Sequence, residues 1–81
     1  MHMSWNYRVT HRPKNPLEGY QIREVYYDDD GNVTLYSRDA IAAHGDISDE
    51  LYEDMCLMMD AFEKEPLNLD HVDYLLGQVE G

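Results

Sequence analysis

The sequence predicts one α+β domain, in which a three-stranded antiparallel sheet precedes one long amphipathic helix and a short C-terminal helix. Three observations predict it: alternating apolar and polar residues before residue 38, an Asp-Gly pair between two such segments, and helical spacing of apolar residues after Ser48. At 81 residues the chain holds only one domain. Residues 5–38 are expected to form its sheet half and residues 47–77 its acidic helical half.

The first strand is expected at residues 5–10, whose alternation places Trp5, Tyr7 and Val9 on one face. A connection rich in proline and glycine leads to the second strand, residues 20–27. The Asp-Gly pair that follows is typical of a tight hairpin, so the third strand is expected at residues 33–38. Residues 39–46 have no clear period and are interpreted as a connection, with a short fourth strand as the alternative.

The long helix is expected over residues 49–64, with Ser48 as its N-cap. At 100° per residue, one narrow arc collects large apolar side chains, which predicts that this arc is the core face. The opposite arc carries mainly acidic side chains. The residues predicted to face the core are Leu51, Met55, Met58 and Phe62, flanked by Tyr52 and Met59.

Pro66 prevents the long helix from continuing, and Asn68 is placed to cap a final short helix. Gly77 is expected to end that helix as its C-cap. Its apolar positions have helical spacing and are Leu69, Val72, Leu75, Leu76 and Val79.

The net charge of −11 is unevenly distributed along the chain. Residues 1–38 carry five basic and five acidic residues, whereas residues 39–81 carry twelve acidic residues and only Lys64 as a base. This excess of negative charge disfavours direct contact with nucleic acid phosphates and favours a basic partner.

Further features bound the class of protein. Cys56 is the only cysteine, which excludes an intrachain disulfide and a cysteine zinc cluster. No apolar run approaches the length of a membrane span or a signal peptide, so we expect a cytoplasmic protein without membrane contact. We interpret Met3 as the native start, and residues 1–2 as a cloning remnant.

The sequence offers little for catalysis, a cofactor or a metal. The acidic turn fails as a calcium loop, because Tyr26 would occupy its first ligand position and Ser37 its twelfth. His11, His44 and His71 lack the spacing of paired metal ligands. Because glycine-rich phosphate loops and serine elbows are also missing, we expect no enzyme, cofactor or metal site.

Two surfaces are candidates for binding a partner. The first lies on the long helix, where the acids could equally serve only as a solvated face that maintains solubility. The apolar Leu57 on the polar side favours a functional surface. The residues of this candidate are Asp49, Glu50, Glu53, Asp54, Leu57, Asp60 and Glu63.

The second candidate surface consists of strand aromatics, which exceed what one sheet face can bury against one helix. Such rings could stack on bases, but the negative charge favours a homodimer or protein interface instead. Its residues are Trp5, Tyr7, Tyr27 and Tyr36.

The segments Trp5-Asn6-Tyr7-Arg8-Val9 and Glu24-Val25-Tyr26-Tyr27-Asp28 followed by Gly31 resemble those of a group of short bacterial and phage proteins. These share a W-N-Y-R-V opening and an E-V-Y-Y-D-x-x-G hairpin and are generally uncharacterised. The resemblance covers residues 4 to about 67 and supports the fold without assigning functional residues. In size and charge the chain is also similar to anti-CRISPR proteins and other phage-encoded DNA mimics.

Together these features predict a small non-enzymatic binding protein. We expect a phage-type inhibitor that occupies a basic, nucleic-acid-binding surface of a partner protein. The alternative is a bacterial housekeeping or regulatory domain that homodimerises through an aromatic sheet face.

Overall fold

A computed structural model describes residues 4–80, with side chains described for residues 4–77. The expected start at Met3 and the remnant before it lie outside this range, as does the side chain of Val79.

The centre of the molecule is an antiparallel pair of long strands, β1 (Ser4–His11) and β2 (Tyr20–Tyr27). A short 3₁₀ turn, η1 (Pro16–Glu18), lies in the connection between them. Strand β3 (Val33–Tyr36) pairs antiparallel with β2, which confirms the predicted hairpin. Gly31 has a φ of 84° in its turn, a conformation that residues with a Cβ rarely adopt.

A fourth strand, β4 (Leu67–Asn68), pairs in parallel with β1 and gives the sheet order β3-β2-β1-β4. The α+β class is therefore confirmed, but the sheet is mixed and curled instead of having three antiparallel strands. Two residues are too few to show a period-2 pattern, so β4 could not be predicted from alternation. The alternative position for a fourth strand, residues 39–46, contains no strand.

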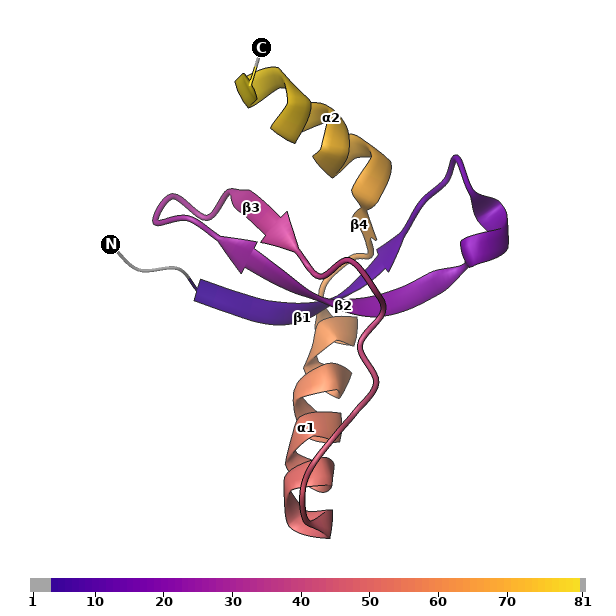
Figure 1. Ribbon diagram of the computed structural model, residues 1–81, viewed down its shortest axis with the longest axis vertical. Helices are drawn as coiled ribbons and strands as arrows, with labels where there is room; N and C mark the ends of the chain where they lie inside the picture. Colours follow the sequence, from indigo (N-terminus) through magenta and orange to yellow (C-terminus); the bar gives the residue numbers. More distant parts are fainter. Residues whose placement is uncertain (1–3, 81) are drawn as a thin grey trace.

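The two main helices leave the sheet in opposite directions (Figure 1). Helix α1 (Ser48–Asp60) continues into the 3₁₀ turn η2 (Ala61–Glu63), and helix α2 (Leu69–Glu80) follows β4 directly. Residues 37–47 run alongside α1 (Figure 1). Neither α1 nor α2 is long and apolar enough to cross a bilayer over the part of the chain described.

Three predicted helix ends can be compared with the structure. Ser48 is the first residue of α1 and makes no capping hydrogen bond, so its predicted role is wrong. Gly77 does not end α2, which extends to Glu80. Asn68 is confirmed as a cap, because its Oδ1 accepts a hydrogen bond from the backbone N–H of His71 at 3.1 Å.

Buried apolar residues lie on both sides of the sheet. On the α1 side, Tyr7 and Val9 of β1 pack with Met58 and Ala61. Val25 points to the other side, and Leu69 and Val72 are buried at the start of α2. Only a short part of α1 therefore contacts the sheet.

Candidate functional site

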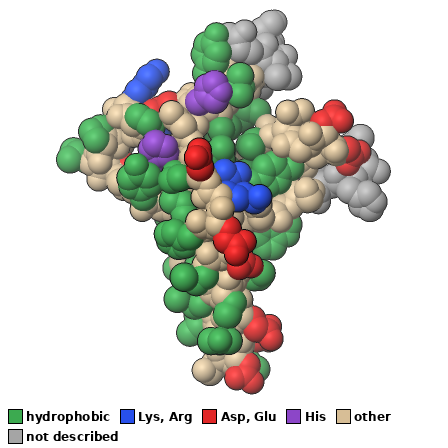
Figure 2. Space-filling view, turned by 180° about the vertical axis from the view of Figure 1, so that it is seen from behind, with side chains coloured by type: hydrophobic (Ala, Val, Ile, Leu, Met, Phe, Trp, Pro, Cys, Tyr) green, Lys and Arg blue, Asp and Glu red, His purple; other side chains and the backbone are tan. Residues whose placement is uncertain are grey.

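Helix α1 has one acidic side that faces solvent. Asp49, Glu53 and Asp60 lie within one arc at 100° per residue, and Glu50 borders it. All four are exposed. Figure 2 shows acidic side chains along one edge of the α1 region and hydrophobic side chains along the other. We refer to these four residues as the acidic side of α1.

The other predicted members of this surface differ in their surroundings. Leu57 is 52% exposed within the same arc, as the sequence suggested. Glu63 is exposed on η2, beyond the end of α1. Glu50 accepts a hydrogen bond from the backbone N–H of Asp46 at 3.0 Å, which ties the start of α1 to its preceding loop.

Asp54 is partly exposed and hydrogen-bonded to other segments of the fold, in contrast to its exposed acidic neighbours. Its Oδ1 accepts a hydrogen bond from the Tyr7 hydroxyl at 2.6 Å, and its Oδ2 accepts one from the backbone N–H of His44 at 2.9 Å. These two hydrogen bonds stabilise the carboxylate and lower the pKa of Asp54. Asp54 thus joins α1, the sheet and the connecting loop, and we assign it a structural role.

Arg12 forms ion pairs with acids of the C-terminal helix α2. Its Nη1 lies 2.7 Å from Oδ2 of Asp73 and 3.6 Å from Oδ1 of Asp70. The Tyr36 hydroxyl donates to Asp73 at 2.6 Å and accepts a hydrogen bond from Arg12. The Asp73 contact is the main reason that the pKa of Arg12 is raised. The negative charge of α2 is therefore partly balanced by the sheet half, which the sequence did not indicate.

Two further arginines of the sheet half form hydrogen bonds within the fold. Arg23 is 4% exposed, donates to the hydroxyl of Thr10 at 2.8 Å and lies 3.8 Å from Glu18. Arg8 donates to the hydroxyl of Tyr27 and to the backbone carbonyl of Glu65. Among residues 4–77 the ion pairs involve only Arg12 and Arg23 as bases, and none includes an acid of α1. The negative charge on the acidic side of α1 is therefore not balanced by an ion pair within residues 4–77.

The four predicted interface aromatics do not share a face. Trp5 and Tyr7 lie on the α1 side of the sheet, with their rings in an edge-to-face contact at 5.2 Å. The strand register places Tyr27 and Tyr36 on the opposite side. Burial and the hydrogen bond to Asp54 raise the pKa of Tyr7 to about 12. Trp5, at 48% exposed, is the most accessible of the four.

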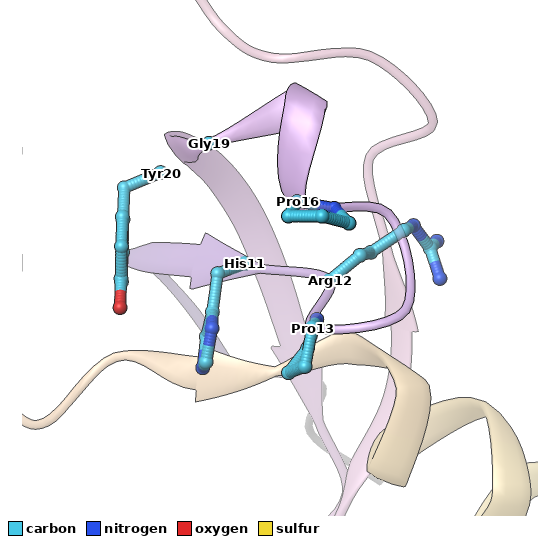
Figure 3. Close-up of a pocket in the computed structure, with 6 residues that line it drawn as sticks. All are labelled: His11, Arg12, Pro13, Pro16, Gly19 and Tyr20. Atoms are coloured by element: carbon cyan, nitrogen blue, oxygen red, sulfur yellow. The ribbon is translucent and has the colours of Figure 1, made fainter.

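A shallow hollow of about 340 Å³ lies at the end of the β1–β2 pair and was not expected from the sequence. Figure 3 shows the rings of His11 and Tyr20 side by side at its edge, and their centroids are 5.0 Å apart. Pro13, Pro16 and Arg12 also line it, and the Arg12 side chain extends away from the His11 and Tyr20 rings (Figure 3). The hollow is therefore lined mainly by ring surfaces, together with Gly19 and the charged residue Arg12, whose guanidinium is bound to Asp73 and Tyr36.

The acidic turn between β2 and β3 forms its own hydrogen bonds. Oδ1 of Asp28 accepts the backbone N–H groups of Asp30 and Asn32, each at 2.9 Å. These backbone bonds lower the pKa of Asp28. Within the described part of the chain no three His, Cys, Asp or Glu side chains are grouped as metal ligands would be.

The predicted core face of α1 is mostly exposed in the structure. Met58 is buried as expected, but the remaining members of the stripe are exposed. Met58 of α1 and Ala61 of η2 make the contact with the sheet, so the contact is displaced toward one edge of the stripe. The exposed fractions are 41% for Leu51, 72% for Tyr52, 49% for Met55, 63% for Met59 and 63% for Phe62.

Comparison of the chain with protein families, curated proteins and solved structures finds no match.

Proposed function

We propose that this protein is a non-catalytic binding protein, whose acidic side of α1 docks on a basic, nucleic-acid-binding surface of another protein. One observation carries the proposal: α1 projects from the sheet with exposed acids that form no ion pair within residues 4–77. A protein of this kind inhibits by occupying the place of nucleic acid. Phage-encoded inhibitors such as anti-CRISPR proteins belong to this functional class.

The spacing of the charges supports this proposal. Residues 49–63 span about 21 Å at the helical rise of about 1.5 Å per residue. Five exposed acids over this length are on average about 5 Å apart along the helix axis, compared with about 3.4 Å between charges on one DNA strand. The acids are Asp49, Glu50, Glu53, Asp60 and Glu63, and Asp54 is omitted because it is only partly exposed and both of its carboxylate oxygens accept hydrogen bonds within the chain.

The alternative function, a regulatory domain that dimerises through an aromatic sheet face, has less support. Trp5 lies on the opposite side of the sheet from Tyr27 and Tyr36. The hydroxyl groups of both tyrosines are already hydrogen-bonded within the chain.

Immobilised protein exposed to a bacterial lysate tests the proposal. We expect capture of nucleic-acid-binding proteins in 50 mM NaCl and their release by added duplex DNA, because protein and DNA would compete for one surface. Retention should fall by roughly an order of magnitude in 500 mM NaCl, since salt screens exposed charges over about 10 Å or less. Proteins retained equally in both salts, or not released by DNA, contradict the proposal.

A charge-matched pair of variants locates the binding surface. Glu53→Lys with Asp60→Lys reverses two acids on the acidic side of α1 and should abolish capture. Asp30→Lys with Asp39→Lys makes the same change in net charge at exposed positions outside α1 and should retain it. Equal loss of capture in both variants would show that the net charge of the protein, and not the acidic side of α1, determines binding.

A further inference from the structure

The exposed apolar stripe of α1 and η2 forms a continuous surface, which we call the apolar side of α1. At 100° per residue its members occupy an arc of about one third of the helix circumference, and this arc contains no charged residue. Tyrosine, methionine and phenylalanine are enriched at the centres of protein interfaces. Its residues are Leu51, Tyr52, Met55, Met59 and Phe62.

The surface area of the chain indicates how much burial is missing. The accessible surface is 6180 Å² for a mass of 9.5 kDa. Compact monomers of this mass expose about 5,000 Å². The excess of about 1,100 Å² exceeds the roughly 800 Å² that each partner buries in a standard interface.

The shape of the molecule also indicates that it is less compact than a typical domain of its size. The radius of gyration is 13.7 Å, compared with about 12 Å for a compact domain of this length. Figure 1 shows the reason, because α1 and α2 extend away from the sheet in opposite directions and are not folded against it along their lengths.

We propose that a second copy of this chain covers the apolar side of α1, so that the protein is a homodimer built on two paired α1 helices. A two-fold axis places the same side of both helices in contact and requires no second kind of surface. The acidic sides then point away from the contact and remain open to another partner. This inference is independent of the proposed function.

A second copy fits the chemistry of the surface better than a different partner. The apolar side lacks the charges that would select a basic or an acidic protein, and its complement is another apolar surface of similar length. Small domains with thin cores commonly obtain the missing burial by oligomerising. Each chain of this protein supplies such a surface to the other.

Sedimentation velocity tests the dimer with one disrupting variant and one control variant. Wild-type protein should sediment at twice the mass of the chain. Met55→Glu combined with Met59→Glu places charges in the contact and should raise the dissociation constant by at least about 100-fold. Leu57→Glu alters an equally exposed residue on the acidic side and should leave the dimer unchanged.

Measurements of folding and salt dependence complete the test. Far-UV circular dichroism should show that the double variant remains folded as a monomer, because both methionines are about half exposed or more. The wild-type dimer should tighten from 50 to 500 mM NaCl, since salt screens the repulsion between two acidic chains. The same change weakens docking on a basic partner, so the two interactions are distinguished.

Specific outcomes overturn the inference. A wild-type protein that remains monomeric at about 1 mM lacks the interface. A dimer that survives the double variant, or dissociates with Leu57→Glu alone, uses a different surface.

Discussion

Tyr7 is the residue on which the packing of α1 against the sheet depends most directly. Its ring is 8% exposed and packs in the core, while its hydroxyl donates to Asp54 on α1. Asp54 also holds the loop at His44. One side-chain pair therefore connects three segments that are distant in sequence.

Removing the hydroxyl in Tyr7→Phe should lower the free energy of unfolding by about 1 to 2 kcal/mol, because a hydrogen bond to a charged group is lost while the ring remains. Urea denaturation measures the change. Tyr26→Phe is the control, since the Tyr26 hydroxyl makes only a 3.3 Å contact with Glu24 and should change stability by less than about 0.5 kcal/mol. Equal effects in both variants would contradict the role assigned to Tyr7.

At the scale of the elements, the connection before α1 depends on a close backbone approach. A Cβ at Gly45 would meet the backbone nitrogen of Leu51 and lie 2.7 Å from the backbone carbon of Glu50. A glycine is therefore required where residues 37–47 pass the first turn of α1.

Gly45→Ala should destabilise the fold by about 1 to 3 kcal/mol, because backbone atoms cannot move aside as a flexible side chain would. Gly77→Ala is the opposite case, since a Cβ there meets nothing within 4 Å and the residue lies inside α2. It should stabilise by about 0.5 to 1 kcal/mol through helix propensity. Thermal unfolding followed by circular dichroism should show a lower melting temperature for Gly45→Ala and a higher one for Gly77→Ala.

At the scale of the whole molecule, pH changes the stability of the fold through two opposing contributions. The net charge of −11 disfavours the compact state at pH 7, and partial protonation relieves this repulsion. Hydrogen bonds to Asp28, Asp54 and Asp73 act in the other direction. They lower the pKa of each carboxyl below its usual value, and at Asp73 they outweigh a burial effect that raises it.

The sign of the pH dependence follows from these lowered pKa values. The three carboxylates stabilise the fold fully above a pH of about 4, and this contribution is lost as pH falls through their folded pKa values. We therefore expect stability to rise from pH 7 to about 5 and to fall below about 4. The urea midpoint of unfolding, measured between pH 3 and 8, reports this pH dependence. Addition of 0.5 M NaCl should remove the rise in stability between pH 7 and 5 but not the fall below about pH 4. A urea midpoint that increases steadily from pH 3 to 8 in low salt would contradict this prediction.

The sequence alone determined the features that depend on neighbouring residues. The hairpin followed from the Asp-Gly turn, the first two strands from their alternation, and the start of α2 from Asn68, because each of these requires contacts within a few positions. The exposure of Asp49, Glu53 and Asp60 also followed from helical spacing.

Only the tertiary structure decided features that depend on distant contacts. Strand β4 is defined by its pairing with β1, and the role of Asp54 by Tyr7 and His44. Helical spacing shows that α1 has an apolar side but not what covers it. That depends on where the helix meets the sheet, and here the contact at Met58 and Ala61 leaves most of the apolar side open.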